Sequence, residues 1–137
     1  MCKAKVLLVD DEPDIVETVE YVLRREGYEV VTATNGVEAI EAARRHLPDV
    51  VLLDVMLPGE NGYRVARTIR DDERSGTIPK RLAVILVTAR DLSMDAEGER
   101  EFTRYCEPDL VIYKPFDIDD LLLLMEKVLR NVNRDPP

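Results

Sequence analysis

The chain has 137 residues, a length typical of one domain that buries roughly two-thirds of its unfolded surface. Its formal net charge of −9 disfavours nonspecific binding to nucleic acid and to anionic membranes, and it favours cation binding wherever carboxylates gather. No apolar run approaches the roughly 20 residues of a membrane span, and no signal peptide precedes the first strand-like run. We therefore expect a cytoplasmic domain that contacts neither DNA nor a membrane directly.

Strand-like and helix-like segments alternate five times along the chain. The predicted strands cover residues 5–9, 29–33, 50–53, 82–87 and 110–113. The predicted helices cover residues 14–26, 36–45, 63–70, a short segment within 95–105, and 118–131. A polar connector runs from Asp71 to Arg81, and residues 132–137 form a tail or a truncated linker. Five βα units in series predict an α/β fold, with right-handed crossovers and helices on both faces of a parallel sheet.

Four of the predicted strands end in polar side chains that can handle a phosphate. These strands are short, rich in β-branched residues and almost continuously apolar, as strands buried on both faces of a parallel sheet are. In such a sheet the ligand crevice lies beyond the carboxyl ends of the strands. One crevice would therefore gather three carboxylates, a hydroxyl and an ammonium group, which belong to Asp10, Asp11, Asp54, Thr88 and Lys114.

Asp54 is the candidate nucleophile of this crevice, because a carboxylate can accept a phosphoryl group as an acyl phosphate. Such a transfer needs in-line placement and cancellation of oxygen charge more than it needs proton chemistry. Asp10 and Asp11 would supply that cancellation by holding Mg²⁺, a hard ion that prefers oxygen ligands. Without the metal, three close carboxylates repel one another, which should raise at least one pKa. The structural alternative is that each aspartate only caps a helix or starts a turn.

Other groups complete the predicted site. Lys114 would pair with a phosphoryl oxygen as a point charge, or it is a solvated lysine before a turn. Thr88 would donate a hydrogen bond to the phosphoryl group, or it caps the fourth helix. The backbone carbonyl of Met56 could complete the metal shell. A cis peptide bond before Pro115 would suit a tight turn that places Lys114.

Four motifs, in this order along the chain, resemble those of the receiver domain of two-component response regulators. They are LVDDEP at residues 8–13, LDVMLPG at 53–59, VTA at 87–89 and KPF at 114–116. The resemblance implies a flavodoxin-like (βα)5 fold, a doubly wound sheet of five parallel strands in the order 2-1-3-4-5. We therefore predict a receiver domain over residues 1–131.

The resemblance also implies a role for each site residue. Asp54 would be phosphorylated by a histidine kinase or a phosphotransfer protein, with small phosphodonors as alternatives. Asp11, Asp54 and the Met56 carbonyl would bind Mg²⁺ directly and Asp10 would bind it through water, with Mn²⁺ as a substitute. Thr88 would be the switch hydroxyl and Lys114 the phosphate-binding lysine. The domain would be a phosphoacceptor that assists its own phosphorylation and dephosphorylation, and not an enzyme in the usual sense.

The chain departs from the family pattern at two places near the surface through which receiver domains are expected to contact their output partners. Val111 stands where receivers often carry Tyr or Phe, three residues before the lysine, while Tyr113 lies two residues further on the same strand face. Residues 106–109 replace the usual small-residue turn before the fifth strand. The last helix is apolar all round at residues 121–125, which indicates either extra burial or a patch for a homodimer or another partner.

The leading hypothesis is a phosphorylation-driven signalling switch that reshapes the surface around the fourth helix, fifth strand and fifth helix. Its output partner is unknown. One alternative is a receiver-like docking module that works without phosphorylation, which Val111 favours. Another is a small phosphatase of the haloacid-dehalogenase type, with Asp10 as nucleophile and Glu12 as second acid. That reading leaves Asp54 unexplained, and the chain has no room for a cap domain.

Overall fold

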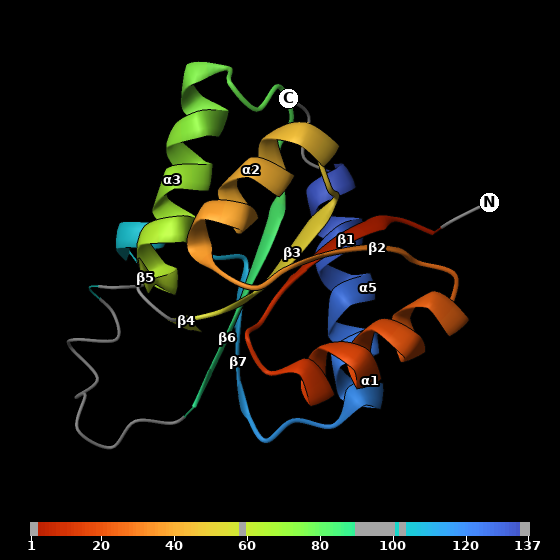
Figure 1. Cartoon of the computed structure of the whole chain (residues 1–137). Helices are drawn as coiled ribbons and strands as arrows, with labels where there is room; N and C mark the ends of the chain where they lie inside the picture. Colours follow the sequence, from red (N-terminus) through yellow and green to blue (C-terminus); the bar gives the residue numbers. More distant parts are fainter. Residues whose placement is uncertain (1–2, 58–59, 90–100, 102–103, 135–137) are drawn as a thin grey trace.

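The computed structural model describes all residues except 1–2, 58–59, 90–100, 102–103 and 135–137. Its centre is a sheet of five parallel strands in the order β2-β1-β3-β6-β7 (Figure 1). These strands are β1 (Lys5–Val9), β2 (Glu29–Ala33), β3 (Val50–Asp54), β6 (Ala83–Ala89) and β7 (Leu110–Lys114). Numbered along the chain within this sheet, the order is 2-1-3-4-5, so the predicted topology is confirmed.

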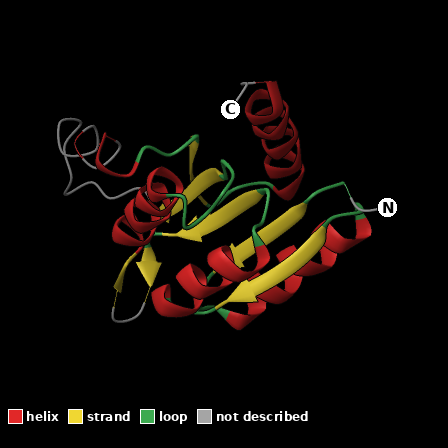
Figure 2. Ribbon diagram, turned by 90° about the horizontal axis from the view of Figure 1, so that it is seen from above, coloured by secondary structure: helices red, strands yellow, loops and turns green. Residues whose placement is uncertain are grey.

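Helices cover both faces of the sheet (Figure 2). Helices α1 (Pro13–Arg25) and α5 (Ile118–Arg134) pack on one face, and α2 (Gly36–His46) and α3 (Gly62–Ser75) pack on the other. Alternate strand residues enter the two cores: Leu8 and Leu52 face the side of α1 and α5, and Leu7 and Leu53 face the other side. Burial on both faces explains why the strands are continuously apolar instead of alternating with polar residues.

Helix α3 extends beyond the predicted helix at both ends: it begins one residue earlier, at Gly62, and continues for five residues after Arg70, to Ser75. The prediction that Asp71 begins a polar connector was therefore wrong. The charged last turn is not a solvated segment, since Arg70 and Asp72 are buried and both are paired with other charges. The helix ends at Gly76, whose φ of 84° lies in the left-handed region that favours glycine.

The last helix also extends beyond its predicted end, from Asn131 to Arg134. Its apolar run divides between core and surface: Leu121 and Met125 are buried, whereas Leu123 is 60% exposed. Leu124 is partly buried and packs against the core. Most of the predicted fourth helix lies outside the described residues. None of the helices in the described part of the chain has the length and apolar content needed to cross a bilayer.

Candidate functional site

The predicted site residues meet at the carboxyl ends of the parallel strands. Asp10 follows β1, Asp54 is the last residue of β3, and Lys114 is the last residue of β7. Asp10, Asp11 and Asp54 each offer a carboxylate oxygen, and these three atoms lie within 4.8 Å of one another. Asp10 and Asp54 are each 4% exposed, while Asp11 is exposed to solvent. Two carboxylates of the cluster are therefore buried, and the third, of Asp11, is accessible to solvent.

Both oxygens of the Asp54 carboxylate accept hydrogen bonds. The backbone N–H of Met56 donates to Oδ1 at 2.9 Å, and the Lys114 ammonium donates to Oδ2 at 3.0 Å. The same ammonium lies 3.7 Å from Asp10 Oδ2 and 3.9 Å from Glu12 Oε1. Lys114 thus partly neutralises the acidic cluster and holds Asp54 in one orientation.

The pKa values of two site groups shift for different reasons. Burial raises the pKa of Asp10, and nearby negative charges add to the rise, although the Glu12 N–H and Lys114 oppose it. For Lys114, burial alone would lower the pKa, but the hydrogen bond to Asp54 and the surrounding carboxylates raise it overall. The predicted rise of a carboxylate pKa is confirmed for Asp10, but burial contributes more to it than repulsion between carboxylates.

Thr88 lies inside β6, one residue beyond Val87, which pairs with Asp54 in the neighbouring strand. Its hydroxyl donates to the carbonyl oxygen of Ala89 at 3.1 Å. Its partner across the β6–β7 pair is Tyr113. The strand register therefore places Thr88 one position beyond the partner of Asp54 and opposite Tyr113. Val111 pairs with Leu86, two positions before Thr88 in β6. The alternative role of Thr88 as a cap concerns residues outside the described part of the chain.

The loop after Asp54 contains a short antiparallel hairpin that the sequence did not predict. Strand β4 (Met56–Leu57) pairs with β5 (Glu60–Asn61). Leu57 is buried and Met56 is 73% exposed, as expected for neighbouring residues on a strand. The predicted cis peptide bond between Lys114 and Pro115 is confirmed.

Sequence reasoning missed two residues that contact this constellation. Glu12 was considered only as part of a motif and as the second acid of the phosphatase alternative, but its carboxylate faces Lys114. Gly62 directly precedes the predicted helix at 63–70 and is the first residue of α3, where it lies directly against the backbone of Asp54. A glycine at a predicted helix start was the available signal, because a close backbone approach is one reason for glycine there.

The hard oxygen ligands of the acidic cluster fit Mg²⁺, which binds one or two carboxylates and usually keeps several waters. The sequence matches the family model of the response regulator receiver domain over residues 6–126. The chain belongs to the response regulator receiver domain family. Receiver domains are phosphoacceptor modules of two-component signalling, where they interact with histidine kinases and output domains. The fold of this receiver domain is accordingly flavodoxin-like.

Curated relatives of this receiver domain differ in length. Protein PilH of Pseudomonas aeruginosa is 35% identical over 127 residues, which cover 92% of this chain and 98% of PilH. The probable transcriptional regulatory protein TcrX of Mycobacterium tuberculosis is 41% identical over 125 residues, which cover 91% of this chain but 49% of TcrX. The chain therefore spans nearly all of PilH and about half the length of TcrX.

Solved structures of other receiver domains share the fold. A CheY-like receiver domain protein from Methanospirillum hungatei has a TM-score of 0.82 at 25% identity, covering 96% of this chain and 98% of that chain. The receiver domain of the sensor histidine kinase PA1611 from Pseudomonas aeruginosa has a TM-score of 0.77 at 30% identity, covering 93% of this chain and 98% of that chain. That structure contains a magnesium ion coordinated in the active-site cleft.

Proposed function

We propose that the chain is a phosphorylation-activated switch of a two-component phosphorelay, with Asp54 as the phosphoacceptor. The observation that carries this proposal is the convergence of three carboxylates and Lys114 on one strand edge, with Asp54 buried among them. Its phosphodonor is a histidine kinase or a phosphotransfer protein. We assign residues 1–131 to the receiver domain and 132–137 to the start of a tail or linker, of which residues 132–134 continue helix α5.

In the proposed reaction, an Asp54 carboxylate oxygen attacks phosphorus and forms a new P–O bond. The P–N bond of a phosphohistidine donor breaks, and the imidazole nitrogen leaves with the electron pair. Asp54 and its neighbours Asp10 and Asp11 would hold Mg²⁺ together with the Met56 carbonyl, Asp10 acting through water. When bound, the ion cancels negative charge on the phosphoryl oxygens. Mn²⁺, with similar oxygen chemistry, would substitute.

Lys114 and Thr88 act on the phosphorylated state. The Lys114 ammonium already touches Asp54 Oδ2 at 3.0 Å, so it needs only a short movement to pair with a phosphoryl oxygen. The Thr88 hydroxyl exchanges its local bond to Ala89 for a stronger bond to the charged phosphoryl group. Its movement biases the surface around the fourth helix, β7 and α5 between two existing states. The same residues assist the later hydrolysis of the acyl phosphate.

The surface of α5 supports an output contact in this region. Leu123 is 60% exposed and lies on a helix that already buries Leu121 and Met125 in the core. A homodimer through the fourth helix, β7 and α5 is the form of output that we propose first. A docking module that needs no phosphorylation is the second candidate, because Val111 occupies the position where receivers often carry an aromatic residue.

Intact-mass spectrometry after incubation with acetyl phosphate and Mg²⁺ tests the proposal. We expect one phosphoryl adduct per chain that requires the metal and is absent from Asp54→Ala. A beryllofluoride complex, which imitates the acyl phosphate, should then shift the protein towards a dimer in light scattering. A folded protein that forms no adduct with acetyl phosphate or with a phosphorylated kinase domain would favour the docking module.

A further inference from the structure

We propose that Gly62 is a positioning residue for the phosphoacceptor site. Because Gly62 has no side chain, the first turn of α3 lies against the backbone of Asp54 and Val55. This contact fixes the loop that carries Met56. The role of Gly62 in phosphorylation rests on the proposed function. The effect of its contact with Val55 on the site can be tested separately, by measuring metal binding.

The space at Gly62 excludes any side chain. A Cβ atom at this position would lie 2.5 Å from Val55 Cα and 2.6 Å from the carbonyl oxygen of Asp54. Both contacts are with backbone atoms, so no flexible side chain can move aside. An ordinary contact begins at 3.4 Å, so the two backbones would have to separate by about 0.9 Å. The requirement for glycine here is therefore one of space, not of an unusual backbone angle.

Hydrogen bonds close the loop at the same place. The Gly62 N–H donates to the carbonyl oxygen of Val55 at 3.0 Å, and the Val55 N–H donates to the carbonyl oxygen of Val87 in β6 at 3.1 Å. Between these points, Met56 pairs with Asn61 in the hairpin. The loop is thus held at its base to both α3 and the central sheet.

The loop in turn positions two groups of the site. The Met56 N–H donates to Asp54 Oδ1 at 2.9 Å and so orients the carboxylate. The carbonyl of the same residue is the backbone ligand that we propose for the metal. A displacement of about 1 Å in groups that must act together can cost about 100-fold in rate. Separating Gly62 from Val55 should therefore disturb the metal site and the nucleophile together.

Gly62→Ala and Gly76→Ala form a matched pair of variants at the two ends of α3. A Cβ at Gly76 meets no atom within 4 Å, but its φ of +84° makes alanine strained there. Gly76→Ala should thus destabilise the same helix without touching the site. The experiment measures Mn²⁺ affinity by electron paramagnetic resonance, the rate of adduct formation with acetyl phosphate, and stability in urea.

We expect Gly62→Ala to weaken Mn²⁺ binding about 10-fold and to slow adduct formation about 100-fold. In Gly76→Ala, the Mn²⁺ affinity and the rate of adduct formation should stay within about twofold of the wild-type values, although the variant loses a comparable amount of stability. Wild-type affinity and rate in Gly62→Ala would overturn the inference. If the wild-type protein binds Mn²⁺ but forms no adduct with acetyl phosphate or with a phosphorylated kinase domain, the proposed function fails, while the affinities of the two variants still test Gly62.

Amide hydrogen exchange of the wild-type protein keeps the inference testable if Gly62→Ala does not fold. The amides of Gly62 and Met56 should exchange at similar rates, because the loop opens as one unit. Mg²⁺ should slow both amides by similar factors. Slowing at Met56 alone, with an unchanged rate at Gly62, would overturn the inference.

Discussion

At the scale of single residues, Asp10 is a buried carboxylate whose negative charge is only partly compensated in the metal-free fold. Its carboxylate is 4% exposed, and burial raises its pKa. The Glu12 N–H donates to its Oδ1 at 3.0 Å, and among the described residues the cation that faces its other oxygen is Lys114, at 3.7 Å. A buried charge with partial compensation is unfavourable in the metal-free fold.

Asp10→Asn should therefore stabilise the metal-free protein, by about 1 kcal/mol, since asparagine keeps the acceptor for the Glu12 N–H and removes the charge. Urea unfolding in EDTA measures this difference. Mg²⁺ should stabilise the wild type clearly more than the variant, because binding to the folded state alone adds stability. A variant that is less stable than the wild type in EDTA would mean that Lys114 fully compensates the Asp10 charge.

The residues of the site differ in how well the sequence predicts them. Asp54 and Lys114 follow apolar runs, and parallel strands bring such residues to one edge, so their meeting is predictable from pattern alone. Gly62 is different, because its function depends on an approach between two backbones that no local pattern reports. Glu12 is similar, since only the path of β7 brings Lys114 within 3.9 Å of it.

At the scale of elements, Arg70 joins α3 to β6 and β7. Its side chain is 4% exposed, and its guanidinium donates to Asp109 Oδ2, Glu73 Oε1 and the carbonyl oxygen of Leu82, each at 2.8 Å. Asp109 Oδ2 also accepts the N–H of Val84 at 2.8 Å. These bonds explain why the last turn of α3 is helical although its sequence is polar. A run of charges usually indicates a solvated segment, so the sequence alone could not predict this turn.

Asp109→Ala should destabilise the fold by about 3 kcal/mol or more, because it leaves Arg70 buried with an incomplete set of partners. Thermal and urea unfolding measure the loss. Glu107→Gln is the matched control, since Glu107 pairs with Arg74 in the same region but both side chains are about half exposed. Its loss should be much smaller, because solvent screens such a pair. Equal losses in the two variants would contradict the special role of the buried pair.

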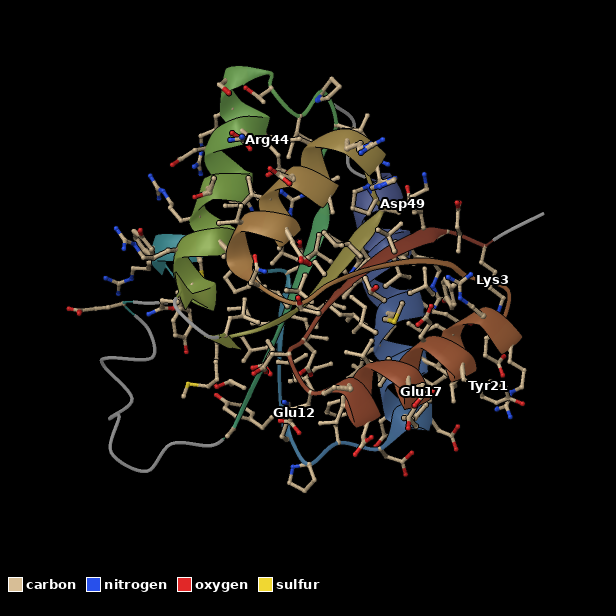
Figure 3. All side chains as sticks on the ribbon, in the orientation of Figure 1. Lys3, Glu12, Glu17, Tyr21, Arg44 and Asp49 are labelled. Carbon is tan, nitrogen blue, oxygen red and sulfur yellow. The ribbon has the colours of Figure 1, made fainter. Side chains whose placement is uncertain are left out.

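At the scale of the whole molecule, the two ends of the parallel sheet carry different arrangements of charge. Glu12 lies near the carboxyl ends of the strands, whereas Arg44 and Asp49 lie toward the other end (Figure 3). At the amino ends, Asp49 pairs with Lys80 and Asp109 pairs with Arg70 and Arg81. At the carboxyl ends, three aspartates gather around Lys114. Paired charges that stabilise the fold thus lie at the amino ends of the strands, and the acidic cluster of the proposed site lies at the carboxyl ends.

Asp49, at the amino end of β3, should make the stability of the fold depend on pH. Burial alone would raise the pKa of Asp49, but the Lys5 N–H and the Lys80 ammonium, each at 2.8 Å, lower it overall. A carboxyl group whose pKa is lower in the folded state stabilises the fold above its unfolded pKa of about 3.9. That stabilisation disappears as the pH falls through the lower folded value. Asp49→Asn should therefore be less stable than the wild type at pH ~7, and the two should converge as the pH falls below the folded pKa of Asp49.

The expected difference at neutral pH is at most about 1 kcal/mol, because the Asp49 side chain is 41% exposed and solvent screens the pair. Urea unfolding of both proteins across this pH range measures it. EDTA is present throughout, so that metal binding at the opposite end does not contribute. If the difference in unfolding free energy between the two proteins stays constant with pH, the loss comes from the geometry of the asparagine and not from the charge of Asp49. Convergence would show that the amino-end ion pairs stabilise the sheet independently of the acidic cluster at the carboxyl ends of the strands.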